Sequence, residues 1–285
     1  MEENDELQAL CLVTFQKESG IKEYFSRRAI IYGGPLVKEG NRESLVFLLH
    51  QLIEYVRRKS IYIEIRNYHD YSQYKSIFEN EIWIYQPYLN FQLNLKEQTI
   101  ENALDSMQNN RRREIKKTLE EGVVYSECKT DQELNELYQI LKNLYDFHIP
   151  SPLPPLIYFT KLFHCEISKV FIVWHHERII GGSICIVLPK CSIYTMYYCG
   201  LRDYHPKIFP SHLAVLAVIE YAISNKIPVL DLMGAGRAGV KYGVRDYKSK
   251  FGGNLIEYGR FLKVINPVLY NIGTIGLKLN SWINK

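Results

Sequence analysis

Residues 231–253 read DLMGAGRAGVKYGVRDYKSKFGG, and this stretch decides the fold class. The apolar run at Val229–Leu232 predicts a short strand that ends by Gly234. Val244–Lys250 has the spacing of a short helix, and Asn254–Phe261 predicts a further strand. GAGRAG is not a dinucleotide-binding motif, because it falls late in the chain and no long helix follows it directly. The alternation of strand and helix predicts an α/β protein.

The region before this stretch has its own regular order. Val170–Trp174, Arg178–Leu188 and Ser192–Cys199 are strand-like runs separated by the short turns HHE and PK, which predicts an antiparallel meander. Pro210–Asn225 follows as an apolar-faced helix, and a helix opened by a capping box at Thr130–Glu133 comes earlier. The C-terminal order is therefore helix, meander, helix, strand, short helix, strand.

The first hundred residues predict a smaller α/β unit. Ile30–Val37 is a strand interrupted by Gly33-Gly34-Pro35, Arg42–Lys59 is helix-like, and Ile61–Arg66 alternates apolar and polar residues as a strand does. We expect an N-terminal unit over residues 1–100. We expect a C-terminal unit over residues 101–285 that includes a basic helix at 109–121.

Composition and charge exclude several classes of protein. The 285 residues are 47% apolar and 23% charged, which suits a folded core. A net charge of +4 argues against a general nucleic-acid coat, so no DNA partner is expected, although local basic patches could still bind phosphates. The six cysteines form no C-x-x-C pair and no cluster with zinc spacing, so no metal site is expected. The acidic start lacks a signal core, and no run of about 18 apolar residues occurs. We expect a cytoplasmic protein.

Three segments resemble the Fem-type branch of the GNAT acyltransferase superfamily. They are NNRRREIKKTLEEGV (109–123), RIIGGSICIV (178–187) and the 231–253 stretch followed by IEYGR. The resemblance implies a mixed-sheet α/β fold of tandem GNAT units, the first one incomplete at its N-terminus. It also implies that two neighbouring strands of the C-terminal unit splay apart to admit an acyl donor. Fem-type relatives include the aminoacyltransferases that build peptidoglycan interpeptide bridges.

The resemblance also bears on the donor and the acceptor. After Gly200 the chain reads LRDYHPK, which lacks the glycines of the pyrophosphate-binding loop of ordinary GNAT acetyltransferases. Aminoacyl-tRNA is therefore favoured over acyl-CoA as the donor, with no resident cofactor. The implied partners are the acceptor end of tRNA and the amine of a nucleotide-linked or lipid-linked cell-envelope precursor. The alternatives are an acyl-CoA-dependent N-acyltransferase acting on an amino sugar of a surface polysaccharide, and a non-catalytic binding protein with this fold.

Two groups of cationic side chains are candidates for substrate binding. Helical spacing places one group on one side of the basic helix, where it binds phosphate or forms a solvated face. Its members are Arg112, Arg113, Lys116 and Lys117. The second group flanks the helix at 244–250 and either contacts donor phosphate or is solvated, with Tyr242 either stacking on a base or filling the core. Its members are Arg245, Lys248 and Lys250.

Asp231 and the pair Gly181-Gly182 are the candidates for residues that contact the reacting groups. Asp231 ends a buried strand before a glycine-rich loop, where it either braces the loop or orients and deprotonates the substrate amine. Gly181-Gly182 interrupts a strand, which indicates a bulge aiming an N–H at the acyl carbonyl or a site of close packing. No Ser/His/Asp or Cys/His nucleophile pattern occurs, so direct transfer is expected.

The last helix carries an apolar stripe that has two interpretations. Val268, Ile272, Ile275, Leu279 and Trp282 share one face, with Lys278 and Lys285 nearby. Packing against the domain is the simpler interpretation. Peripheral contact with the inner membrane surface is the other.

Overall fold

The computed structural model describes residues 2–3, 6–18, 20–149 and 151–283. The chain forms two compact units, which are residues 1–89 together with 257–285 (unit 1) and residues 90–256 (unit 2). The chain passes from unit 1 to unit 2 within β9 (Tyr88–Asn94) and returns at the end of β15 (Asn254–Glu257). The predicted division at residue 100 therefore differs from the observed one, mainly because residues 257–285 fold with the N-terminal unit.

Unit 1 is built on a five-stranded mixed sheet. Its strand order is β4 (Thr14–Gln16), β5 (Arg28–Gly33), β7 (Tyr62–Asn67), β16 (Arg260–Val264) and β8 (Ile84–Gln86). β5 and β7 are parallel, and β16 pairs antiparallel with both β7 and β8. The smaller pairs are β1 (Glu2–Glu3) with β2 (Glu6–Leu7), and β3 (Ala9–Leu10) with β6 (Leu36–Val37). β16 inserts between two N-terminal strands, which explains why the C-terminal segment belongs to this unit.

One face of the unit 1 sheet carries the core. α2 (Arg42–Val56) and α3 (Lys75–Asn80) pack there, with Leu45 and Leu49 against Ile31 and Ile63. Strand alternation sends Tyr62, Glu64 and Arg66 of β7 to the opposite face. The remaining helices are α1 (Glu23–Ser26) and α10 (Pro267–Ile283), which contact each other, and two 3₁₀ turns at Gly20–Lys22 and Ser72–Tyr74.

Unit 2 contains a seven-stranded mixed sheet. Its order is β10 (Val123–Glu127), β11 (Ser168–His175), β12 (Arg178–Leu188), β13 (Ser192–Gly200), β14 (Val229–Arg237), β9 and β15. β11, β12 and β13 form the predicted antiparallel meander. β13 and β14 are parallel neighbours.

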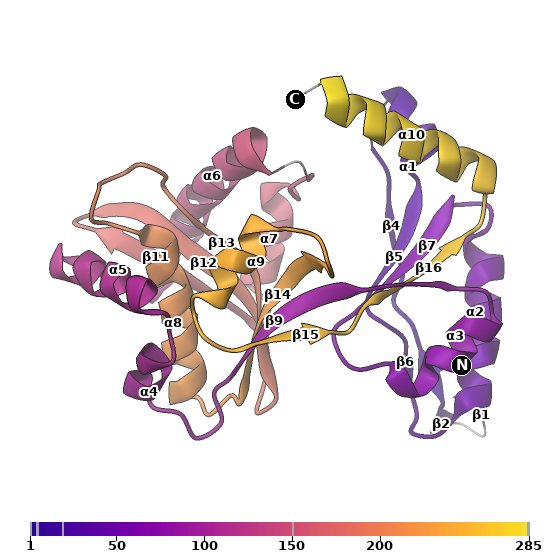
Figure 1. Ribbon diagram of the computed structural model, residues 1–285, viewed down its shortest axis with the longest axis horizontal. Helices are drawn as coiled ribbons and strands as arrows, with labels where there is room; N and C mark the ends of the chain where they lie inside the picture. Colours follow the sequence, from indigo (N-terminus) through magenta and orange to yellow (C-terminus); the bar gives the residue numbers. More distant parts are fainter. Residues whose placement is uncertain (1, 4–5, 19, 150, 284–285) are drawn as a thin grey trace. The chain divides into compact units, whose positions relative to one another are not determined.

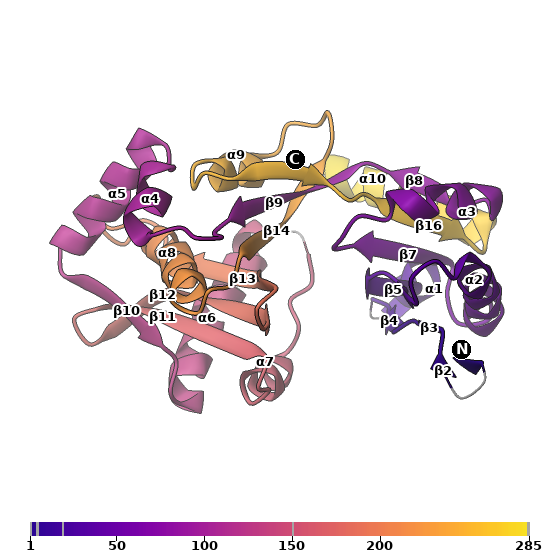
Figure 2. The ribbon, with the colours of Figure 1, turned by 90° about the horizontal axis from the view of Figure 1, so that it is seen from below.

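Helices cover both faces of the unit 2 sheet (Figures 1 and 2). α6 (Asp131–His148) and α7 (Leu156–Phe163) pack with Leu137, Leu141 and Phe159 against Val170 and Ile172 of β11. α8 (Pro210–Ser224) lies on the other face and is joined there by α4 (Ile100–Asp105) and α5 (Asn109–Glu120). α9 (Gly243–Ser249) contacts β14.

Local sequence signals explain several of these boundaries. Thr130 caps α6, because its side-chain oxygen accepts a hydrogen bond from the backbone N–H of Glu133 at 3.2 Å, as the capping box predicts. Pro210 occupies the first position of α8, where its missing N–H costs nothing. The strand predicted at 254–261 is divided into β15 and β16, with Gly259 at φ +66° between them.

Candidate functional site

The strands β13 and β14 pair only over their first residues. Their register joins Ser192 to Val229, Ile193 to Leu230 and Tyr194 to Asp231, and no pairing follows. Beyond this point β13 continues to Gly200 and β14 to Arg237. A parallel ladder that stops after three pairs leaves backbone N–H and C=O groups of both strands without their usual partners. The strand divergence implied by the family resemblance is thus present in unit 2.

A cleft of about 1130 Å³ opens where the two strands separate. Its walls come from the end of α6, the second half of β13, the loop after β13, the first residues of α8, the middle of β14, and α9. Every lining residue belongs to unit 2. The volume exceeds that of most sites for small ligands, so the cleft can hold an extended substrate.

The side chain of Lys248 lines the cleft on the side formed by β14. Its side chain is 4% exposed, and its ammonium donates to the carbonyl oxygens of Leu232, Met233 (3.3 Å) and Gly234 (2.8 Å). An ammonium has three N–H donors, so all of them are occupied by β14. Burial lowers the pKa of Lys248 to about 8, and Asp231 opposes this shift. Lys248 lines the cleft, but its contacts hold the diverging strand rather than a phosphate.

Arg245 also binds backbone carbonyl groups, near the end of β14 and in the loop between β14 and α9. Its guanidinium donates to the carbonyl oxygens of Ala235 (2.8 Å), Val240 (2.9 Å) and Arg237. These bonds connect the end of β14, which contains Gly236, to the following loop, which contains Gly239. Arg245 and the half-buried Lys250 are absent from the cleft wall, whereas Tyr242 lies on it. Of the cationic group predicted around α9, the structure therefore brings only Lys248 to the cleft.

Asp231 sits at the last paired position of β14 and is fully buried. Its carboxylate accepts hydrogen bonds from Asn90 (3.1 Å) and Gln92 (3.0 Å) of β9 and from the backbone N–H of Met233 (2.6 Å). Burial raises the pKa of Asp231, while the amide donors of Gln92 and Asn90 oppose that shift. These hydrogen bonds connect β9 to β14 at the position where β13 and β14 begin to separate. This geometry favours the bracing role over the role of proton acceptor.

Gly181 and Gly182 lie in the middle of the sheet, paired with both β11 and β13. The register of β11 and β12 shifts beside them, as the predicted bulge requires. A Cβ at Gly181 would lie 2.6 Å from the carbonyl oxygen of Cys199, and one at Gly182 would meet the carbonyl oxygen of Phe171. Neither glycine lines the cleft. The structure supports close packing and not a bond to an acyl carbonyl.

Gly200 brings the first turn of α8 to the end of β13. A Cβ on Gly200 would lie 2.6 Å from the backbone nitrogen of Ser211 and 2.8 Å from Cβ of Pro210. This close approach places Pro210 and Ser211 in the cleft wall. The positive end of the helix dipole therefore points into the cleft, where it favours anions.

The basic face of α5 lies outside the cleft wall. Arg112 forms an ion pair with Asp105 (2.5 Å), and Lys116 lies 3.9 Å from Glu120, while Arg113 and Lys117 are exposed. Ile115 is buried, but Leu119, which helical spacing places on the same side of α5, is 43% exposed, so the buried apolar side of this helix is narrow. Phosphate binding by this face stays a prediction.

Arg111 is buried between aromatic rings, on the side away from that basic face. Its guanidinium lies 4.4 Å from the ring centre of Tyr247 and 4.3 Å from that of Phe251. The side chain thus joins α5 to α9. Burial lowers the pKa of Arg111, and Tyr247 and Glu114 oppose the shift.

Several residues of the cleft wall were not among the candidates. Arg202, which is exposed, lies in the loop after β13, and His148 ends α6. Tyrosine rings form much of the wall, and Tyr198 stacks on Tyr247 with ring centres 5.5 Å apart. Burial raises the pKa of Tyr145, Tyr198 and Tyr247, so their hydroxyls stay protonated. The order of elements was the signal that could have located Arg202, because the loop between the meander and α8 borders the fork.

Cys199 is the one cysteine of the cleft wall among the described residues. It is buried, and burial raises the pKa of its thiol to about 12. A thiol in this state is a poor nucleophile at neutral pH. The described residues contain no group of three or more His, Cys, Asp or Glu side chains that could hold a metal ion.

The apolar stripe of α10 is partly exposed. Val268 (68%), Ile272 (47%) and Ile275 (57%) are open to solvent, so these three do not pack against their own unit as the simpler interpretation required. The side chains of Leu279, Trp282, Lys278 and Lys285 lie outside the described part of the chain. Tyr270 packs edge-on against Tyr62, and Gly273 lies close to Phe25, which places these residues against unit 1. Among the described residues, no helix is long and apolar enough to cross a membrane.

Comparisons with known proteins agree with this geometry. Residues 167–276 match the FemAB family. FemX has a similar structure, with a TM-score of 0.72 and 14% identity, over 95% of this chain and 88% of FemX. The C-terminal domain of a putative lysylphosphatidylglycerol synthetase from Agrobacterium fabrum follows, with a TM-score of 0.65 and 12% identity over 95% and 85% of the two chains.

A tandem GNAT protein from the clavulanic acid biosynthesis pathway is also similar, with a TM-score of 0.54 and 10% identity over 84% of this chain and 76% of that one. No curated protein sequence matches the chain. The predicted mixed α/β fold of tandem GNAT type is confirmed. Residues 167–276 thus match the FemAB family, and the chain has a fold similar to those of FemX and of a tandem GNAT protein.

Proposed function

We propose that the protein transfers an aminoacyl group from aminoacyl-tRNA to the amine of a cell-envelope precursor. The observation that carries this proposal is the cleft at the β13–β14 fork, with the edge of β13 beyond Tyr194 on one wall and a helix N-terminus beside it. The FemAB match and the resemblance to FemX and to a lysylphosphatidylglycerol synthetase domain support aminoacyl transfer as the reaction class.

The two walls of the fork have different tasks in this proposal. On β14 the carbonyl groups of residues 232–234 are taken by Lys248. The edge of β13 from which β14 diverges after Tyr194 is therefore the wall left for the donor. An N–H of this wall can donate to the carbonyl oxygen of the aminoacyl ester and stabilise the negative charge that develops there during attack.

The anionic end of the donor needs a positive surface. The N-terminus of α8 at Pro210 and Ser211 supplies one, and the exposed Arg202 beside it adds a guanidinium that binds phosphate oxygens in pairs. This surface contains no glycine-rich loop. The positive charge comes from the helix end and one arginine instead, which suits the terminal nucleotides of tRNA.

Transfer proceeds directly from donor to acceptor. The amine nitrogen forms a bond to the ester carbonyl carbon, the bond to the ribose oxygen breaks, and the amine proton passes to that oxygen. Direct attack by the amine needs no enzyme nucleophile, and burial raises the pKa of the Cys199 thiol to about 12, which makes that thiol a poor nucleophile at neutral pH. Asp231 is buried with three hydrogen-bond donors, so solvent or a phosphate of the substrate relays the proton from the amine to the ribose oxygen.

The test is a transfer assay with purified protein, tRNA charged with labelled amino acids, and amine-bearing peptidoglycan precursors. We expect labelled precursor, and we expect Arg202→Gln to raise the KM for the charged tRNA roughly tenfold with little change in kcat. Arg58→Gln, which removes an exposed arginine of unit 1, is the control. Transfer from acyl-CoA to an amino sugar in the same assay would favour the alternative enzyme. Donor binding without any turnover would favour a binding protein.

A further inference from the structure

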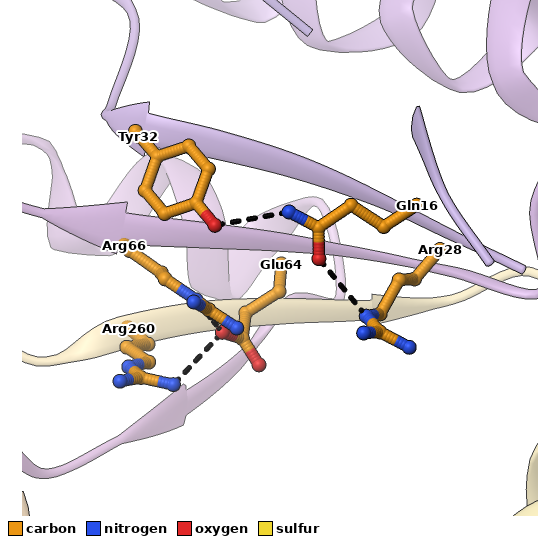
Figure 3. Close-up of polar contacts among 6 residues, drawn as sticks. All are labelled: Gln16, Arg28, Tyr32, Glu64, Arg66 and Arg260. Carbon is orange, nitrogen blue, oxygen red and sulfur yellow. Dashed lines mark hydrogen bonds and ion pairs between the residues drawn. The ribbon is translucent and has the colours of Figure 1, made fainter. Parts of the chain in front are cut away.

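The face of the unit 1 sheet opposite α2 and α3 carries a cluster of charged side chains that the proposed function does not use. Glu64 of β7 accepts two hydrogen bonds on one oxygen, from Nε of Arg66 and from Nη1 of Arg260 at 2.9 Å (Figure 3). The side chains of Glu64, Arg66 and Arg260 are 13%, 29% and 22% exposed. They lie on the face opposite α2 and α3.

This arrangement places two like charges directly opposite each other. The register of β16 and β7 pairs Arg260 with Arg66. Like charges at facing positions of neighbouring strands are destabilising, and a single carboxylate oxygen offsets them only in part. Burial lowers the pKa of Arg260, Glu64 opposes this, and Arg66 adds to it. The cluster therefore keeps a net positive charge that its own residues do not neutralise.

The two guanidiniums keep donors for a further ligand. Among the described residues, the terminal nitrogens of Arg66 and the Nε and Nη2 atoms of Arg260 have no hydrogen-bond acceptor. Aromatic rings set the orientation of both groups. Arg260 lies 3.7 Å from the ring centre of Tyr88, and Arg66 lies 5.3 Å from that of Tyr32.

A second layer of contacts holds the neighbouring side chains in place. Gln16 donates to the hydroxyl of Tyr32 at 3.0 Å and accepts from Nε of Arg28 at 3.3 Å (Figure 3). The half-exposed Glu18 lies 3.7 Å from Arg28. Tyr32 thus links Arg28 and Gln16 to Arg66, and the cationic face extends over three neighbouring strands, β5, β7 and β16.

We propose that Arg66 and Arg260 form a binding site for a phosphoryl group on the partly exposed face of the unit 1 sheet opposite α2 and α3. Adjacent strands lie about 4.8 Å apart, so two guanidiniums at facing positions can each bind oxygens of one tetrahedral phosphate. A carboxylate has two oxygens and is satisfied by a single guanidinium. Glu64 holds the two arginines together and competes with the ligand. This inference concerns unit 1 alone and goes beyond the transfer reaction proposed for unit 2.

The test is calorimetric titration of the full chain at constant ionic strength with inorganic phosphate, glycerol phosphate and succinate. We expect saturable binding of both phosphates and weaker binding of succinate. Arg66→Gln and Arg260→Gln should each weaken phosphate binding roughly tenfold or more. Glu64→Gln should strengthen it several-fold, since the competing carboxylate is removed while its shape remains. Arg58→Gln is the matched control and should leave binding unchanged.

Thermal unfolding of each variant shows whether it is folded. If the arginine variants unfold, Glu64→Gln decides alone: tighter phosphate binding supports the site, and equal or weaker binding overturns it. The proposal is also overturned if wild type and Glu64→Gln show no saturable phosphate binding, if succinate binds as tightly as phosphate, or if Arg58→Gln weakens binding as much as the cluster variants. The titration needs no donor and no turnover, so its failure leaves the transfer proposal untouched.

Discussion

Replacement of Lys248 by Met tests how the fork is held open. Lys248 donates to three carbonyl groups of β14 that follow its last residue paired with β13. Met keeps the length and apolar character of the side chain but removes the ammonium. The variant therefore leaves the carbonyls of residues 232–234 without their donor, and it also removes a buried charge.

The pH dependence of this substitution follows from the lowered pKa. Burial brings the pKa of Lys248 from 10.5 to about 8. Between these values the unfolded chain carries a proton on Lys248 that the folded chain has released, so raising the pH stabilises the wild type. The gain is about 1.4 kcal/mol per pH unit, or about 3 kcal/mol over the whole window. Lys248→Met lacks this contribution. The amount by which the variant is less stable than the wild type is therefore smallest below pH 8 and grows as the pH rises above 8.

Urea unfolding followed by circular dichroism at pH 7 to 9.5 measures the effect. The informative quantity is the difference in free energy of unfolding between wild type and variant, because other groups titrate alike in both proteins. Lys241→Met is the matched control, since Lys241 is exposed in the loop before α9. A difference for Lys248→Met that stays flat across pH 8 to 9.5, or that matches the control, would show that Lys248 is not a buried clamp on β14.

The remaining predictions concern packing, the basic face of α5, and α10. Gly200→Ala places a methyl group 2.6 Å from a backbone nitrogen and should destabilise the protein by about 2 kcal/mol, whereas Gly234→Ala, with open space around it, should change the urea midpoint little. Removing two of the exposed cations of α5, with Arg113→Gln and Lys117→Gln together, should weaken binding of charged tRNA roughly threefold or more if this face binds phosphate, and an unchanged KM would identify it as a solvated face. Vesicles of phosphatidylglycerol should carry the protein upward in flotation if the exposed stripe of Val268, Ile272 and Ile275 contacts membranes, and Ile272→Ser should reduce the floated fraction. Recovery of the wild type in the bottom fraction would exclude that contact.

Much of the fold follows from local sequence signals. The meander, the capping box at Thr130 and the proline at the start of α8 each act within a few residues, and the structure confirms all three. The length of β14 was underestimated, because the strand continues through Met233 at φ +64° and Gly236 at φ +79°. The placement of β16 beside β7 depends on a pairing across nearly 200 residues, which no local pattern encodes.

The candidate site was predicted less well than the fold, for a physical reason. A cation in a sequence suggests an anionic ligand, but a strand that leaves its neighbour exposes carbonyl groups that also attract cations. Lys248 and Arg245 bind such carbonyl groups. Asp231 likewise binds amide donors of β9, which lies more than 130 residues away in the sequence. Arg202 was missed because nothing in its immediate neighbours distinguishes it from a solvated loop residue.

The central claim is that the donor binds in the fork between β13 and β14. Photocrosslinking with a charged-tRNA analogue that carries a light-activated aminoacyl group, followed by peptide mapping, tests it most directly. We predict crosslinks to residues 195–202 of β13 and its following loop and to residues 242–248 of α9, reduced by excess unmodified charged tRNA. Crosslinks confined to unit 1 or to the basic face of α5 would contradict the claim.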